Sequence, residues 1–227
     1  MTASLTLFHV PDWGSSIIRL VLEEIGAPHE VRLMDWDAGD FDSPAFRAIN
    51  PLGLIPALNT PEGPIFETAA VLLWLNERFG GLGPREGEPD RLAFLSWLFF
   101  VANTLHPTVL ALVYPDRAGG PEVAPAVQRL AFERLNTQAA QLETLITTRN
   151  PTWLSTEKPG AIGHYLGMLL RWAICQPEDP QLRFSLRPFP ALKAVLAAHE
   201  SSPAAQRAIL ADALGPHPFT APKLAPT

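Results

Sequence analysis

Residues 50–58, Asn-Pro-Leu-Gly-Leu-Ile-Pro-Ala-Leu, and residues 66–75, Phe-Glu-Thr-Ala-Ala-Val-Leu-Leu-Trp-Leu, decide the fold of this 227-residue chain. The first stretch ends in a β-prone run, and a second short run ends at Phe66. A Thr-Pro-Glu-Gly segment separates the two runs, which predicts a hairpin. Glu67 then opens a helical segment that continues to Phe79. We expect the apolar stripe of this helix at Ala70, Leu73 and Trp74.

Upstream of the hairpin, strand and helix signals alternate. Residues 5–9 are β-prone, and residues 15–26 form an amphipathic stretch that a serine opens and a glycine closes, as in a helix. Residues 29–34 predict a second strand, and residues 42–49 a short helix that Asn50-Pro51 stops. The order strand, helix, strand, helix, hairpin, helix predicts a mixed four-stranded sheet with helices over it.

Downstream of the hairpin, only helix signals remain. Residues 81–90 are polar and rich in glycine and proline, which is typical of a linker between a domain at 1–80 and an all-α domain at 91–215. Helices are expected at 90–112, 127–146, 160–175, 190–199 and 202–214, joined by short loops as in a bundle. Pro107 should kink the first of them. The tail at 216–227 contains four prolines and is expected to be irregular.

The motif at 50–58 and 66–75 resembles the glutathione transferase superfamily, whose pattern is Asn-Pro-x-Gly-x-Val/Ile-Pro, a hairpin, and Glu-Ser at the start of a helix. The likeness is weaker at Pro11 to Gly26, and it extends into the helical half through the element order and Arg171-Trp172. It implies a thioredoxin-like, glutathione-binding α/β domain followed by an all-α helical bundle.

The same resemblance implies which residues hold glutathione. In the family the bond before Pro56 is cis, and it turns the N–H and C=O of Ile55 outward to pair with the cysteinyl backbone. A trans proline at an edge strand is the alternative. Glu67 and Thr68, at a helix amino end, would bind the γ-glutamyl group: the N–H groups and the hydroxyl bind its carboxylate, and the acidic side chain binds its ammonium. The alternative is that Glu67 or Thr68 simply caps the helix, and the two roles can hold together.

The catalytic group is less evident. A transferase of this kind must favour the glutathione thiolate, which a hydroxyl donor and a helix amino end would do. Phe8 replaces the tyrosine that some classes use, and Gly14 replaces the cysteine of others. Ser15, with Ser16 second, is therefore the candidate catalytic hydroxyl. A serine that simply caps the helix is the alternative.

Three departures from the family pattern stand out. Leu54 occupies a position where the family often has a lysine or another polar residue, and the first half contains no lysine that could hold the glycyl carboxylate. Arg47 is the candidate substitute, with a solvated helix arginine as the alternative. In the third bundle helix, Gly160 and Gly163 replace a Ser/Thr-x-x-Asp capping pair, which should weaken the helix start by about 1 kcal/mol.

The electrophile would bind between the halves, because domain junctions favour apolar clefts. The candidate lining residues are Trp13, Val113 and Tyr114, although ordinary packing explains each equally well. The histidines have no ligand-like spacing, so we assign no metal.

Composition narrows the function further. A net charge of −6 and a pI near 5.5 offer no basic surface for nucleic acid. Cys175 is the only cysteine, which excludes an internal disulfide and a Cys-x-x-Cys pair. The chain has no recognisable secretory signal, and its most apolar stretch, residues 93–102, is too short to span a bilayer. We therefore expect a cytoplasmic protein without a membrane span, and a homodimer that covers the spare apolar faces of residues 93–102.

The leading hypothesis is a glutathione transferase that uses glutathione as cosubstrate and conjugates its thiolate to small hydrophobic electrophiles, as in detoxification. The alternative is a non-catalytic binding or interaction protein with the same fold, which Phe8, Gly14 and Leu54 favour. Disulfide chemistry is a third hypothesis. Because the first half has no cysteine, that chemistry would depend on the sulfur of glutathione itself.

Overall fold

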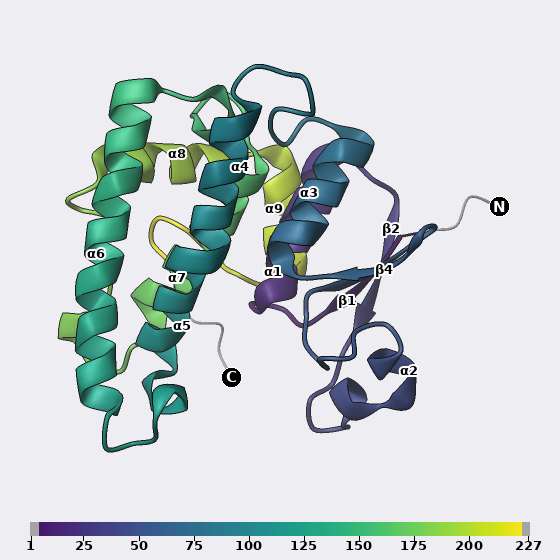
Figure 1. Ribbon diagram of the computed structural model, residues 1–227, viewed down its shortest axis with the longest axis horizontal. Coiled ribbons are helices and arrows are strands. Elements are labelled where there is room, and N and C mark those ends of the chain that lie inside the picture. The colour runs from purple at the N-terminus through teal and green to yellow at the C-terminus, as the bar shows by residue number, and fades with distance from the viewer. Residues whose placement is uncertain (1–4, 224–227) are drawn as a thin grey trace.

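The computed structural model describes residues 5–223, so the first four residues and the last four of the predicted tail lie outside it. An α/β part and a helical part lie side by side (Figure 1). The sheet contains β1 (Leu5–His9), β2 (His29–Leu33), β3 (Ala57–Thr60) and β4 (Gly63–Phe66) in the order β2-β1-β3-β4. β1 pairs with β2 in parallel, and the other pairs are antiparallel. The predicted mixed sheet and hairpin are thus confirmed.

The two faces of the sheet are covered by different helices. Successive strand residues point to opposite faces, so Leu7 joins the main core while Phe8 joins a smaller one. The main core includes the buried faces of α1 (Gly14–Ile25) and α3 (Thr68–Phe79). The smaller core includes Phe46 of α2 (Pro44–Arg47), whose ring centroid lies 5.3 Å from that of Phe8. Phe8 is therefore a packing residue.

The predicted stripe of α3 was wrong in phase. Ala70 is exposed, and Leu73 and Trp74 are only half-buried. The buried positions are Thr68, Ala69, Val71, Leu72, Leu75 and Asn76. Residues 69–75 are apolar on nearly every side, so periodicity alone could not show which side faces α1 and the helical half.

The helical half begins with a long interrupted helix. It consists of α4 (Arg91–Phe100), a π-helical stretch (Val101–Leu105) and α5 (His106–Val113). Pro107 has no N–H to donate and would crowd the preceding turn, and the wider π-helical turns lie just before it. The predicted continuation through this proline is confirmed.

Four further helices complete this half: α6 (Ala124–Arg149), α7 (Ala161–Cys175), α8 (Pro190–Glu200) and α9 (Pro203–Ala211). Short 3-10 turns lie at Asp40–Asp42, Pro115–Ala118, Thr152–Leu154 and Pro180–Leu182. Helix α7 is central, because every residue from 161 to 173 is buried. Helix α9 returns to the first half and packs against α1.

The start of α7 is capped by a distant residue. Nε2 of His199, in α8, accepts a hydrogen bond from the N–H of Gly160 at 3.0 Å. A Cβ at Gly163 would overlap the same imidazole ring. Nδ1 of His199 donates to the carbonyl of Val195, which leaves Nε2 free to accept. His199 thus takes the role of the acidic side chain that Gly163 lacks. The hydroxyl that Gly160 lacks is not replaced by a side-chain cap from this residue.

The tail beyond α9 has no helix or strand up to residue 223, yet it is well packed. Phe219 is fully buried and contacts α7 where Gly167 has no side chain. The carboxylate of Glu200 accepts hydrogen bonds from the N–H groups of Phe219 and Thr220. These contacts bring the tail against α7 and α8.

Within residues 5–223, the composite helix Arg91–Val113 is the one stretch that is long and apolar enough to cross a membrane by length and composition. A third of its apolar window is buried. The helix is longer than the predicted stretch at 93–102, so the expectation that it is too short to span a bilayer was wrong. In this structure α5 packs against α6 and α7. Much of the apolar surface of Arg91–Val113 is left uncovered within the single chain.

Candidate functional site

The loop before β3 meets the amino end of α1. The Ile55–Pro56 peptide bond is cis, and β3 begins at the following residue. A Cβ at Gly14, the first residue of α1, would lie 3.2 Å from Cδ of Pro56 and 3.3 Å from the oxygen of Ile55. Glycine at this position therefore lets the helix end approach the loop, and a larger residue such as cysteine would be crowded there.

The amino end of α3 forms a second wall. Glu67 is the N-cap residue, is exposed, and has a φ of 69°. A residue with a Cβ in this conformation costs on the order of 1 kcal/mol, and such backbone strain is concentrated at functional positions. Thr68 follows as the first residue of the helix and is buried. No side chain caps this end, so its N–H groups are available to an anion.

Two residues of the helical half reach this wall. The Tyr165 hydroxyl in α7 and Nδ1 of His106 in α5 are hydrogen-bonded at 2.7 Å. Burial raises the pKa of Tyr165, the negative charge of Glu67 raises it further, and a hydrogen bond with Thr68 acts in the opposite direction. Burial lowers the pKa of His106 to about 4. At neutral pH the tyrosine is thus protonated and the histidine uncharged beside the start of α3.

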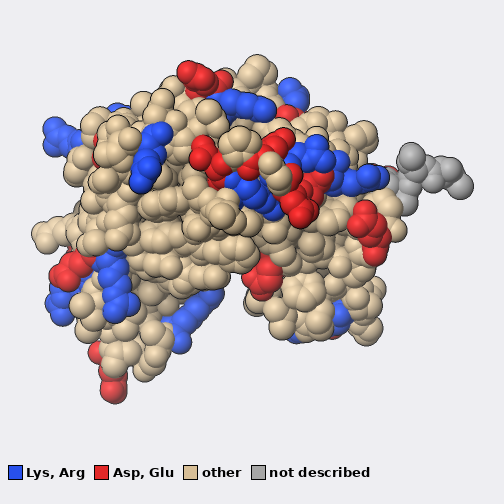
Figure 2. Space-filling model, turned by 45° about the horizontal axis from the view of Figure 1, so that its top comes forward, with Lys and Arg blue, Asp and Glu red and all other residues tan. Residues whose placement is uncertain are grey.

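These elements enclose a junction between the two halves. Figure 2 shows the surface hollowed as a notch between the helical half and the α/β half. From the α/β half come the start of α1, the Ile55–Pro56 loop and the start of α3. From the helical half come His106, Tyr165 and Trp172, whose ring centroid lies 6.2 Å from that of His106.

Ser15 lies in the first turn of α1, and its catalytic role stays a prediction. Its side chain is fully buried behind the first turn of α1. Its Oγ is 2.9 Å from Nδ1 of His9, accepts from the N–H of Val10 at 3.1 Å and donates to the carbonyl of Val10 at 3.2 Å. These contacts account for the serine as a structural residue.

Ser16 is equally enclosed. It is fully buried, and its Oγ donates to the carboxylate of Asp212 at 2.7 Å and accepts from the N–H of Asp12 at 3.0 Å. Asp212 also binds His9 at 3.0 Å and forms an ion pair with Arg19. Burial raises the pKa of Asp212, but the hydrogen bonds of His9 and Ser16 and the charge of Arg19 outweigh it and hold the pKa below its usual value. Neither predicted catalytic hydroxyl is presented to a ligand in this arrangement.

Arg47 braces the loop that leads to Ile55. Its guanidinium donates to the carbonyl of Pro51 at 2.8 Å and pairs with Asp42 at 2.6 Å. The same group lies over Gly53, whose φ is 64° and where a Cβ would clash with it. Its assignment to the glycyl carboxylate of glutathione stays a prediction.

The predicted electrophile-lining residues lie on different halves. Trp13 is 42% exposed and stacks on Phe41, with ring centroids 6.0 Å apart, in an aromatic cluster of the first half. Tyr114 follows the end of α5, is 39% exposed, and lies under the guanidinium of Arg117 at 3.9 Å. Val113 is half-buried against the main core. The roles of Trp13, Val113 and Tyr114 in a pocket stay predictions.

Sequence reasoning missed the contributions of His106, Tyr165, Asp12 and Arg171. Arg171 carried a usable signal, because it is the only Lys, Arg, Asp or Glu in the otherwise apolar α7. A lone charge in a buried helix needs a partner. Its partner is Asp12, in the loop between β1 and α1.

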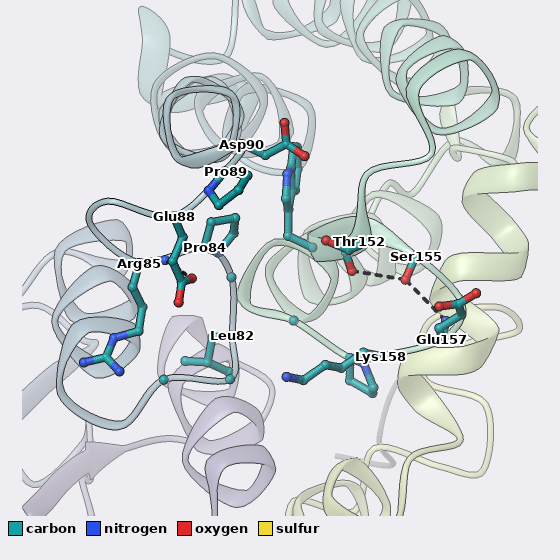
Figure 3. A pocket seen from close by; sticks show the side chains of 16 residues that line it. Leu82, Pro84, Arg85, Glu88, Pro89, Asp90, Thr152, Ser155, Glu157 and Lys158 are labelled. Atoms are coloured by element: carbon teal, nitrogen blue, oxygen red, sulfur yellow. Dashed lines mark hydrogen bonds between the residues drawn. The ribbon is translucent and has the colours of Figure 1, made fainter.

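A separate cavity of about 840 Å³ lies between residues 80–90 and the loop before α7 (Figure 3). It is at the carboxyl end of α3, about 18 Å of helix from Thr68. Charged side chains of both signs surround it, including Arg85, Glu88 and Lys158. It does not belong to the junction site.

Side chains that could bind a metal ion are not clustered in the described part of the chain. Across residues 5–223, no cluster of three or more histidine, cysteine, aspartate or glutamate side chains could hold a metal ion. Cys175 is half-buried, and burial raises the pKa of its thiol.

Comparisons with known proteins support the fold. Residues 3–77 match the family described as glutathione S-transferase, N-terminal domain. A glutathione S-transferase from Xylella fastidiosa has the same fold, with a TM-score of 0.77, 21% identity, and coverage of 93% of this chain and 100% of that one. A sphingomonad glutathione S-transferase solved with glutathione is 25% identical, with a TM-score of 0.73 over 92% of this chain and 100% of that one.

Curated relatives are also similar. The disulfide-bond oxidoreductase YfcG of Escherichia coli is 28% identical over 92% of this chain and 96% of that protein. The uncharacterized GST-like protein YncG of Escherichia coli is 30% identical over 49% of this chain, a match that spans only 55% of YncG. The fold is thus a thioredoxin-like domain joined to a helical bundle. Residues 3–77 therefore belong to the glutathione S-transferase N-terminal domain family, and the chain as a whole has the fold of glutathione transferases.

Proposed function

We propose that this protein binds glutathione in the junction and conjugates its thiolate to small apolar electrophiles. One observation carries the proposal: the start of α1 lies against the cis Ile55–Pro56 loop, and the start of α3 lies beside Tyr165 of the other half, whose hydroxyl is hydrogen-bonded to His106. The backbone of Ile55 would pair with the cysteinyl residue. Glu67 and Thr68 would hold the γ-glutamyl ammonium and carboxylate.

The thiolate would be stabilised by backbone groups of α1. Among residues 5–223, no group accepts a hydrogen bond from the N–H of Gly14 or Ser15, and the first turn contains no acidic residue. A helix amino end favours an anion and lowers a thiol pKa. Gly14, which has no side chain, lets these donors approach the Ile55–Pro56 loop where the cysteinyl residue would bind.

The test combines binding and turnover. Calorimetry with glutathione should give saturable binding, and the rate with a chloronitroarene should exceed the uncatalysed rate. S-methylglutathione should bind as well, because the γ-glutamyl contacts do not involve sulfur. Absence of glutathione binding at millimolar ligand would overturn the proposal.

A non-catalytic glutathione-binding protein is the second candidate. The observation that favours it is the enclosure of Ser15 and Ser16, which leaves no side-chain hydroxyl of the first turn at the surface. Binding without conjugation of several electrophile classes would support it. A disulfide substrate belongs in the same panel. Two glutathione molecules would reduce it to two thiols and form glutathione disulfide, without a protein cysteine.

A second copy of the chain is proposed to cover α4 and α6. A groove of about 530 Å³ lies between α6 and the segment of Phe100 and Thr104, and Leu130, which lines it, is 54% exposed. On α4 itself, Phe99 is 48% exposed. Exposed apolar surface of this kind is typical of a subunit interface. Sedimentation equilibrium should give twice the chain mass, and Leu130→Glu should give the monomer. A cytoplasmic location is part of the same proposal.

A further inference from the structure

The loop that leads into α1 contains a charged residue in an unusual conformation. Asp12 has a φ of 62°, a region that residues with a Cβ seldom adopt. It lies two residues before Gly14, and its side chain is 18% exposed. Something outside the loop must hold this backbone in place.

Arg171 of α7 provides that restraint. Its side chain is fully buried, and its Nε and Nη2 groups donate to the two carboxylate oxygens of Asp12, each at 2.8 Å. The adjacent Trp172 donates its indole N–H to the carbonyl of Asp12 at 2.9 Å. A bidentate pair of this kind fixes direction as well as distance.

The same guanidinium also binds the tail. Arg171 donates to the carbonyl of Leu214 at 3.1 Å and to that of Lys223 at 3.0 Å. One buried cation thus joins the loop before α1, the helix α7 and the end of the described chain. The carboxylate of Asp12 is its only anionic partner among residues 5–223.

We propose that the Asp12–Arg171 pair is a positioning device that places the amino end of α1 and balances the charge beside the sulfur of bound glutathione. This inference rests on the proposed function. The pair as a whole is neutral, so the helix end acts on the thiol without an unbalanced charge from either partner. Removing one partner leaves the charge of the other within about 7 Å to 10 Å of the sulfur, the span of two residues plus a ligand contact.

Other titratable groups face the same region and also affect the pKa of the bound thiol. His9, Arg19 and Asp212 form the buried network behind the first turn of α1. Cys175 lies close enough for both partners to affect it: the charge of Arg171 lowers the pKa of its thiol and that of Asp12 raises it. These groups are unchanged in the variants below.

The experiment measures the pKa of the bound glutathione thiol, from thiolate ultraviolet absorbance against pH. Asp12→Asn keeps the shape and tolerates a positive φ, but leaves the cation of Arg171 unbalanced. The thiol pKa should fall by about 1 to 2 units, from unit charges about 7 Å to 10 Å apart at an effective dielectric constant near 20. Arg171→Gln leaves the aspartate unbalanced, and the thiol pKa should rise by a similar amount.

Opposite signs distinguish this role from a structural one, because loss of shape would move both variants in the same direction. Glu24→Gln is the control, since it weakens contacts of α1 with Ser202 and His164 at the far end of the helix. It should leave the thiol pKa unchanged. If Arg171→Gln does not fold, Asp12→Asn decides alone. A fall supports the inference, and no change or a rise overturns it.

Binding of S-methylglutathione distinguishes failure of the proposed function from failure of the positioning role. If it fails to bind the unmodified protein, the proposed function fails. If it binds the unmodified protein and both variants within about threefold, while the thiol pKa moves in the same direction or not at all, only the positioning role fails.

Discussion

The two ends of the proposed glutathione site in the α/β half are held in place in different ways. The cradle formed by Ile55–Pro56 and Glu67–Thr68 comes from a motif of two dozen consecutive positions. The thiol end, residues 12–16, is fixed by Arg171 and Asp212 from the opposite end of the chain. Local motifs were therefore sufficient to predict the cradle, whereas the thiol end depends on contacts that only tertiary structure brings together.

The start of α7, like the thiol end, depends on a contact between distant residues. The largest change in stability is expected there. His199→Ala should lower the free energy of unfolding by about 3 kcal/mol, because it leaves a cavity and an unpaired buried N–H at Gly160. Urea unfolding followed by circular dichroism measures this. In the same background, Gly163→Asp should recover part of the loss by restoring a local cap. No recovery would argue against the capping role.

Low pH should weaken the contact between His199 and Gly160. Burial lowers the pKa of His199 to about 3, with a further contribution from the nearby His164. Because the folded value is below the unfolded value near 6.5, the neutral ring stabilises the fold fully above pH 6.5. This stabilisation is lost as the pH falls from 6.5 toward 3. Unfolding free energies of His199→Asn should be less steep over that window than those of the unmodified protein. Equal slopes would rule out His199 as the source.

The cradle should respond through binding rather than stability. Glu67→Gln removes the charge proposed to pair with the γ-glutamyl ammonium, and should weaken glutathione binding about 10-fold to 100-fold, the range for a charged hydrogen bond. The side chain is exposed, so the unfolding free energy should change little. Calorimetry gives the dissociation constant. A change under twofold would remove Glu67 from the proposed site.

The difference between local signals and distant contacts explains which features could be predicted from the sequence. Alternation, glycine and proline positions and the motif located all four strands and the main helices, because these signals are local. The phase of α3 failed, since its sequence is apolar on nearly every side. The surroundings of Ser15 could not be predicted for a different reason: a serine in the first turn can face the ligand or the core, and its contact with the buried His9 has no signature in the sequence.

Ser15→Ala tests that reinterpretation at the thiol end. Loss of the hydrogen bonds to His9 and Val10 should lower the unfolding free energy by about 1 kcal/mol. The pKa of bound glutathione should shift by less than about 0.3 units, since the backbone N–H groups remain. A much slower conjugation rate at unchanged stability would restore Ser15 as the thiol partner.

The smallest effect is expected at Arg47, on α2. Its pair with Asp42 is exposed on both sides, and such pairs contribute about 0–1 kcal/mol. Both ends of its guanidinium are already engaged, by Pro51 and by Asp42. Arg47→Gln should therefore weaken glutathione binding by less than about threefold, through a looser loop before Ile55. Asp42→Asn is the matched control and should have a similar effect, because it releases the same brace. A tenfold loss in Arg47→Gln alone would instead identify the arginine as the ligand of the glycyl carboxylate, and the cradle would then extend onto α2.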